Sequence, residues 1–234
     1  MTAATYEHPH CSTFSYDYMR WFVRLAQSNG YRFYTCKEFL EAGSPRRHAF
    51  VMKHDLDAKP ATLPGLLALE KELGIRSTVY VRVTANDYNV MSYLVMPALV
   101  KAERDGFEVG LHTNFLEYAT INGLDPVQVL TAEVNLLKEF LNVRGVSTHR
   151  DLNYAYNALP WLEERWTWLS RTLDLDYQAY DRRLMDNTTY VNEGYSPHLC
   201  WRNKKPEEAI ATGDSVYMLT HNHWWFKDHP FETW

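Results

Sequence analysis

Short apolar segments alternate with helical segments along most of this chain, and this alternation constrains the fold more than any other feature of the sequence. The apolar segments cover residues 50–53, 78–83, 107–111, 145–148 and 215–219, with weaker candidates at 177–180 and 188–191. Apolar residues recur at helical spacing in residues 15–30, 60–73, 93–104, 126–140 and 159–173. Strands separated by helices pair in parallel, because a parallel pair needs a long crossover connection. Six or seven such units predict an α/β fold with a barrel or a partly open barrel.

The chain is long enough to form this fold as one domain. It has 234 residues, of which 46% are hydrophobic, and α/β barrels of this size are commonly undivided. No linker, repeat or low-complexity segment separates one part from another. We therefore expect a single domain over residues 1–234, with an N-terminal helical extension of about residues 1–45.

Composition and charge argue against several classes of protein. The net charge is -5 and the 24 Lys and Arg residues are scattered, whereas a nucleic-acid-binding protein clusters them against phosphates. No run of 18 apolar residues occurs, so no membrane span is expected. The amino terminus lacks a signal-peptide pattern, and three cysteines without metal-type spacing indicate reduced thiols. We expect a cytoplasmic protein with a small-molecule or glycan-precursor substrate; the sequence does not indicate its oligomeric state.

Polar side chains able to bind a metal ion or transfer a proton follow four of the predicted strands. These residues are Asp55 and Asp57, His112, His149 and His221. The carboxyl ends of parallel strands lie on the same side of a sheet, so we expect the five side chains to converge there. One or two imidazoles with a carboxylate are a typical ligand set for a catalytic zinc or similar divalent ion.

A metal site of this kind predicts hydrolysis. The ion lowers the pKa of a water molecule toward neutrality and polarises a substrate carbonyl. A second carboxylate nearby can accept the proton of that water, and a histidine on the opposite side can protonate the leaving group. The strand ends supply candidates for each of these roles.

Four stretches of sequence, in this order, resemble the motifs of the polysaccharide deacetylase family. They are KHDLD at 53–57, DGFEVGLHT at 105–113, THR at 148–150 and LTHNHWW at 219–225. More narrowly, they are similar to the HDxD-containing branch of its NodB-homology, carbohydrate esterase family 4 type. The resemblance implies a distorted (β/α)7-type barrel. It also implies metal-dependent removal of an acetyl or similar acyl group from an N-acylated sugar or a related small amide.

The resemblance also implies roles for individual residues. Asp55 matches the general base and Asp57 a metal ligand, while His112 stands at the leading ligand position of the second motif. Arg150 lies near the position of an arginine that orients the base. His221 matches the histidine that acts as general acid.

The chain departs from the family pattern at the second metal-binding histidine. Typical members carry it four residues after the first, where this chain has Leu116. His149 is the preferred substitute, with Asn114 and Glu117 as further candidates. The missing histidine also favours an alternative function, that of a catalytically silent carbohydrate-binding or scaffold protein on the same barrel.

The first motif leaves two assignments open. Leu56 separates two acids that are adjacent in typical members, so Asp55 and Asp57 could exchange the roles of base and ligand. His54 is a metal ligand, a residue behind the ligands, or a structural hydrogen-bonding residue. The resemblance implies one divalent ion, for which zinc is the first expectation and cobalt, manganese, nickel and iron are alternatives.

Four residues are candidates for substrate binding. Trp224, Trp225 and His223 belong to the final motif, and Tyr154 remains, with Arg150, from the third motif. An indole face suits both a sugar ring and a hydrophobic core, and for the two tryptophans packing is favoured over substrate contact. The segment from 221 to 226, with His229, is also a candidate for an independent metal or sugar-binding patch.

Overall fold

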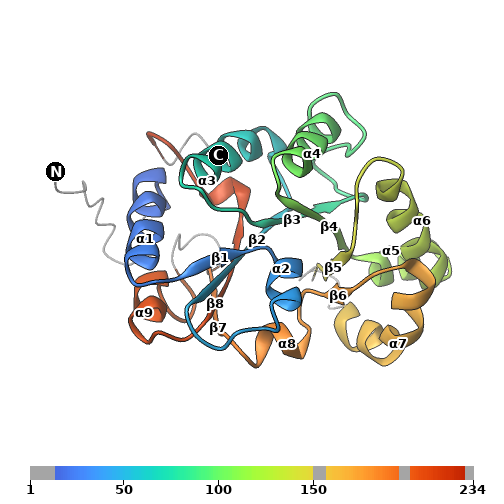
Figure 1. Ribbon diagram of the computed structural model, residues 1–234. Helices are drawn as coiled ribbons and strands as arrows, with labels where there is room; N and C mark the ends of the chain where they lie inside the picture. Colours follow the sequence, from blue (N-terminus) through green and yellow to red (C-terminus); the bar gives the residue numbers. More distant parts are fainter. Residues whose placement is uncertain (1–13, 150–156, 195–200, 230–234) are drawn as a thin grey trace.

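The computed structural model describes residues 14–149, 157–194 and 201–229. Its strands form one parallel sheet in the order β6-β5-β4-β3-β2-β8-β7, and β1 pairs with the first half of β2 (Figure 1). The strands are β1 Arg32–Tyr34, β2 Ala49–Leu56, β3 Thr78–Arg82, β4 Glu108–Thr113, β5 Gly145–Thr148, β6 Tyr177–Gln178, β7 Thr189–Asn192 and β8 Val216–His221. The sheet curls into a barrel whose edge strands, β6 and β7, do not pair in the part of the chain described. The expected distorted (β/α)7-type barrel is confirmed.

Helices cover the outside of this sheet. They are α1 Tyr16–Ser28, α2 Cys36–Glu41, α3 Leu63–Glu72, α4 Val95–Arg104, α5 Phe115–Asn122, α6 Pro126–Lys138, α7 Ala158–Leu173, α8 Arg182–Met185 and α9 Pro206–Ala211, with 3-10 turns η1 Pro60–Thr62 and η2 Asn222–Trp224. In Figure 1, α1 and α9 lie beside one half of the sheet, and α4 to α7 cover the other half. The sequence did not predict β1, α5, α8 or α9.

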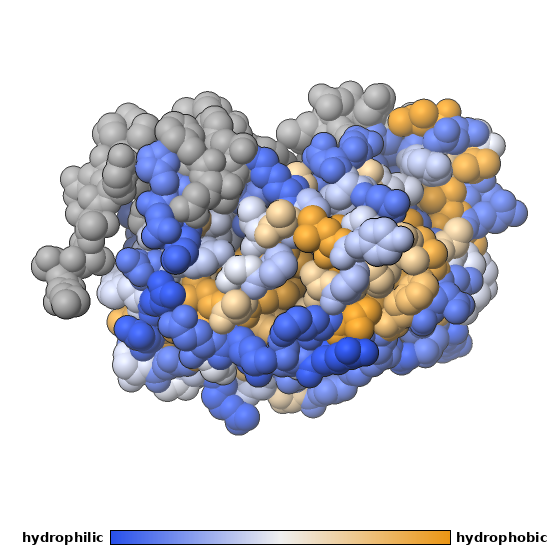
Figure 2. All heavy atoms as spheres, turned by 90° about the horizontal axis from the view of Figure 1, so that it is seen from above, coloured by the Kyte–Doolittle hydropathy of each residue, from blue (hydrophilic) through white to orange (hydrophobic). Residues whose placement is uncertain are grey.

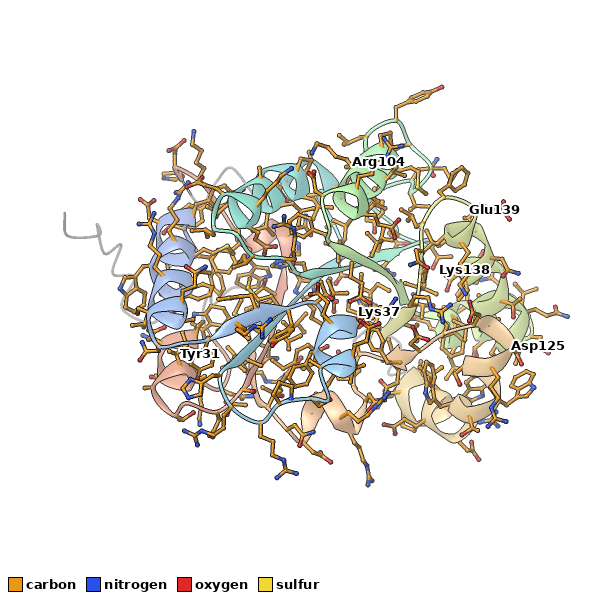
Figure 3. The ribbon with its side chains drawn as sticks, in the orientation of Figure 1. Tyr31, Lys37, Arg104, Asp125, Lys138 and Glu139 are labelled. Carbon is orange, nitrogen blue, oxygen red and sulfur yellow. The ribbon has the colours of Figure 1, made fainter. Side chains whose placement is uncertain are left out.

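Side-chain caps explain where several helices begin. The Ser15 hydroxyl accepts a hydrogen bond from the backbone N–H of Tyr18 at the start of α1, and Asp125 caps α6 by accepting from Val127 (Figure 3). Such caps satisfy amide groups that have no partner within the helix. Behind its cap, α1 buries the apolar face expected from its spacing: Met19, Phe22, Val23 and Ala26.

The N-terminal region is tied into the barrel. β1 pairs with β2 in parallel, with Phe33 opposite Phe50. The Tyr31 hydroxyl donates to the carbonyl oxygens of Ile210 and Asp214, at 3.1 and 2.8 Å (Figure 3). The segment from residue 14 to 45 therefore contributes a strand to the sheet as well as two helices.

Aromatic side chains fill the barrel interior below its carboxyl end. The Tyr80 hydroxyl donates to that of Tyr177 at 2.8 Å, and Tyr177 donates to Glu108 at 2.7 Å. The fit is tight, because a Cβ atom at Gly145 would collide with the Tyr177 ring and one at Gly110 with the Tyr80 ring. We call Tyr80, Tyr177, Tyr217 and Glu108 the interior plug. These side chains fill the barrel interior.

On the face shown in Figure 2, hydrophilic residues border apolar patches that lie mainly in the middle and on the right of the view. Within the described ranges, none of the helices combines the length and the apolar character that crossing a membrane requires. Cys36 is buried and free; Cys11 and Cys200 lie outside the described residues.

Candidate active site

The polar strand ends meet in one cavity at the carboxyl end of the sheet. Its volume is about 320 Å³. The five predicted residues Asp55, Asp57, His112, His149 and His221 all line it, together with residues that include His223, Trp224, Glu193, Tyr180 and Arg202. They come from β2, β4, β8 and the segments that follow β5 and β7, as expected where parallel strands end on the same side.

Asp57 lies at the centre of three imidazoles. Its Oδ1 is 3.2 Å from His112 Nε2, and its Oδ2 is 3.4 Å from His149 Nε2 and 3.1 Å from His221 Nε2. Ligand atoms of Asp57, His112 and His149 all lie within 4.8 Å of one another. Burial alone would raise the pKa of Asp57, but His112 and the other imidazoles hold it well below its usual value.

This donor set fits a divalent cation. His112 Nδ1 lies 2.9 Å from the carbonyl oxygen of Ser147, and a carbonyl can only accept, so Nδ1 carries the proton. In the neutral ring, Nε2 then turns a lone pair toward the Asp57 carboxylate. A divalent cation between these two acceptors would satisfy both of them, as a second proton on the imidazole would. Asp57 Oδ1 is buried and makes no hydrogen bond within the described ranges, which leaves it available as a ligand atom.

His149 stands where the missing histidine would be needed. Leu116 is partly buried and packs against the hydrophobic core, so it contributes nothing polar to the site. The other two candidates face elsewhere: Asn114 and Glu117 bond to each other at 3.4 Å and do not line the cavity. Among the substitutes considered from the sequence, the structure brings only His149 to Asp57.

Asp55 has different surroundings from Asp57. Its two carboxylate oxygens lie 3.3 and 3.1 Å from Nζ of Lys53, and only 2% of the residue is exposed. Burial alone would raise the pKa of Asp55, but the Lys53 ammonium, followed by His112, holds it below its usual value. A carboxylate that stays ionised next to the ligand cluster is suited to accept a proton.

Glu193 is a site residue that sequence reasoning missed. One of its oxygens contacts His221 Nδ1 and accepts from the His221 backbone N–H at 3.0 Å. Burial would lower the pKa of His221, but Glu193 and then Asp57 raise it well above its usual value. Glu193 directly follows β7, which the sequence indicated as a weaker strand candidate. A search for polar residues at the end of that strand would have found it.

The turn after β2 is fastened to the end of β8. The Asn222 side-chain amide donates to the carbonyl oxygens of Ala58 and Lys59, at 3.0 and 2.9 Å, and to Thr62 Oγ1 at 2.8 Å. Lys59 adopts a left-handed conformation with a φ of 47°. These bonds hold the segment that carries Asp57 in place.

His54 belongs to a separate, structural group. It points to the opposite face of β2 from Asp55, since side chains alternate along a strand. Its Nε2 lies 2.5 Å from Glu70 and its Nδ1 2.8 Å from Thr220 Oγ1, and it is fully buried. Of the roles left open for His54, the structure supports only the structural one.

The two adjacent tryptophans have different surroundings. Trp224 and His223 line the cavity, and burial, followed by His221, lowers the pKa of His223 to about 4. Trp225 is 1% exposed and its indole N–H donates to Thr220 Oγ1 at 3.0 Å. The prediction that Trp225 binds substrate is therefore wrong, because the 3-10 turn η2 directs it into the core. Arg150 and Tyr154 lie outside the described residues.

Comparisons with known proteins find similar folds among solved structures. No protein-family model and no curated protein matches the sequence. The *Streptococcus pyogenes* deacetylase PplD in complex with acetate matches with a TM-score of 0.54 and 15% identity, over 91% of this chain and 93% of that one. A *Streptococcus mutans* CE4 esterase matches with a TM-score of 0.52 and 15% identity, over 84% and 82%. The chain has the CE4 deacetylase fold. In this CE4 fold, the cavity at the carboxyl end of the sheet holds the Asp57–His112–His149 cluster.

Proposed function

We propose that this chain is a divalent-metal-dependent hydrolase that removes an acetyl or similar acyl group from an N-acylated sugar or a related small amide. The observation that carries the proposal is the Asp57 carboxylate facing the Nε2 atoms of His112 and His149, beside a second carboxylate, Asp55. Asp57, His112 and His149 would hold the ion. Their nitrogen and oxygen donors suit zinc first.

A divalent ion held there supplies Lewis acidity, which polarises the acyl carbonyl and makes water more acidic. Asp55 accepts a proton from the attacking water, and Lys53 keeps Asp55 ionised for this step. The water oxygen adds to the carbonyl carbon, and the carbon–nitrogen bond then breaks.

His221 protonates the departing nitrogen. It lines the cavity with Nε2 toward Asp57, and Glu193 at Nδ1 favours its charged form, which carries the proton to be donated. The products are a free amine and a carboxylic acid. The *S. pyogenes* neighbour was solved with acetate, the acid that deacetylation would release.

The size and lining of the cavity suit a sugar-sized ligand. At about 320 Å³ it is near the lower end of the range for small-molecule sites. Trp224 and Tyr180 supply aromatic surface in its wall, which suits the apolar face of a sugar ring, and Arg202 and His223 add polar groups. We propose Trp224 and His223 as substrate contacts on this basis.

Metal content and acetate release together test the proposal. Wild type purified without a chelator should contain about one equivalent of divalent ion, His112→Ala should lose it, and His221→Ala should retain it while losing turnover. Acetate release from a panel of N-acetylated sugars would be measured for all three. Wild type that takes up none of zinc, cobalt or manganese would overturn the proposal and support the silent binding protein instead.

A further inference from the structure

We propose that Lys53 holds Asp55 away from the metal ion, so that Asp55 stays a base while Asp57 serves as a ligand. Lys53 is then a positioning residue that acts through Asp55. This inference rests on the metal site of the proposed function. It concerns a buried side chain to which the sequence motifs assign no role.

Lys53 is fully enclosed, and each of its contacts is specific. The side chain is 0% exposed. Its Nζ lies 3.1 and 3.3 Å from the two carboxylate oxygens of Asp55 and 3.0 Å from Ser147 Oγ. The ammonium also lies over the rings of Tyr80 and Tyr180, at 5.3 and 4.9 Å from their centroids. Three hydrogen-bond acceptors and two aromatic faces therefore fix its position.

The strand geometry directs Lys53 to Asp55. Residues two apart in a strand point to the same face, so Lys53 and Asp55 of β2 share the barrel interior. Burying an ammonium group is unfavourable unless it is paired and hydrogen-bonded. Lys53 meets that requirement by binding both oxygens of the carboxylate.

Without this hold, Asp55 is close enough to join the ligands. His112 Nε2 lies 3.7 Å from Asp55 Oδ2 and 3.2 Å from Asp57 Oδ1, so both carboxylates border the same imidazole. A rotation of the Asp55 carboxylate would bring an oxygen to an ion bound there. Lys53 opposes that rotation because it binds both oxygens.

Ser147 of β5 links the lysine to the ligand cluster. Its Oγ accepts from Lys53 Nζ, and its carbonyl oxygen accepts from His112 Nδ1. Ser147 thus fixes the position of Lys53, which holds the base, relative to His112, a proposed ligand. The family resemblance gives orientation of the base to Arg150, which lies outside the described residues; Lys53 holds the base from its own strand.

A double-mutant cycle on metal affinity tests the inference. Zinc and cobalt affinities would be measured by chelator competition for wild type, Lys53→Met, Asp55→Asn and the double variant. Lys53→Met should bind metal about tenfold more tightly, because the released Asp55 adds a ligand. In the Asp55→Asn background the same substitution should give a much smaller gain. The cobalt absorption spectrum should change in Lys53→Met and revert in the double variant.

Kinetics supply a second measurement. With Asp55 engaged by the ion, kcat of Lys53→Met should fall at least about a hundredfold while KM changes little. His54→Gln is the matched control, since His54 is the next residue, is equally buried and also pairs with a carboxylate. It should lower stability but leave metal affinity and the cobalt spectrum as in wild type.

Two results would overturn the role of Lys53: wild-type metal affinity and spectrum in Lys53→Met, or an affinity gain of equal size in the Asp55→Asn background. The second would mean that Lys53 only repels the ion. If Lys53→Met does not fold, Lys53→Gln loses the charge but keeps a hydrogen-bond donor; it should give a smaller gain in metal affinity that again disappears in the Asp55→Asn background. Metal binding needs no substrate, so failure of the deacetylase assay leaves this test intact. Wild type that binds no divalent ion overturns both proposals.

Discussion

Strand β2 carries, on its opposite faces, two buried pairs of a basic side chain with a carboxylate, and they differ in what surrounds them. On one face, His54 pairs with Glu70, which also accepts from Ser77 Oγ at 2.6 Å. On the other face, Lys53 pairs with Asp55 beside an open cavity. The first group is sealed and its polar atoms are satisfied, as a structural network requires. The second borders buried atoms of Asp57 and His149 that have no hydrogen-bond partner among the described residues, as expected of a ligand site.

The largest effect is expected on the side of β2 that borders the open cavity. Replacing Asp57 with Asn removes the carboxylate at the centre of the imidazoles, so metal and turnover should be lost together, with activity down more than about a thousandfold. Metal analysis and an acetate assay would measure this. Thermal unfolding of the variant should stay cooperative, and retained metal would show that Asp57 is not a ligand.

Glu193 should matter nearly as much, but in a different way. Glu193→Gln removes the charge that favours the protonated His221, and turnover should fall by about 10²–10⁴. Metal content should stay at the wild-type level, since Glu193 contacts the imidazole and not the cluster. Loss of metal in this variant would contradict the separation between acid and ligands.

The sealed side should respond in stability only. Glu70→Gln weakens the contacts to His54 and Ser77 in a fully buried network, and should lower the free energy of unfolding by about 2–4 kcal/mol. Urea denaturation would measure the loss. Turnover per folded molecule and metal content should match wild type; a changed metal affinity would show that the two faces of β2 are coupled.

A surface group of three charged residues, Asp105 with Lys71 and Lys101, sets the lower limit of the series. Hydrogen bonds from Lys101 and Lys71 lower the pKa of Asp105 to about 2. A depressed carboxyl pKa stabilises the fold above the unfolded-state pKa, near 4, and this contribution is lost as pH falls toward 2. Asp105→Asn should therefore lower Tm by about 1–2 °C at most at pH 7, and the difference should shrink between pH 5 and pH 3. A constant difference would contradict an ionic origin.

The parts of the site that could be predicted from the sequence are those set by strand ends. Asp55, Asp57, His112, His149 and His221 each follow an apolar run, and parallel pairing alone brings them together. The pattern also predicted the strands from β2 to β5 and β8, because their continuous apolar runs are distinctive.

The remaining parts depend on contacts that no local pattern encodes. Lys53 reads as the polar end of a strand, and its burial depends on Ser147 and Tyr180, which are distant in sequence. Trp224 and Trp225 have the same local sequence context, and only the turn η2 decides which of them faces the cavity. The short strand β1 has three residues, too few to show a period.

The interior plug has a consequence for inhibition by product. Tyr80, Tyr177 and Glu108 fill the barrel interior beneath the cavity, so in the proposed reaction substrate and both products would pass through the mouth at the carboxyl end. A product molecule that stays bound there blocks the entry of the next substrate. Inhibition by the released acid should therefore be competitive with substrate. The steady-state rate should fall as product accumulates, because product and substrate use the same mouth.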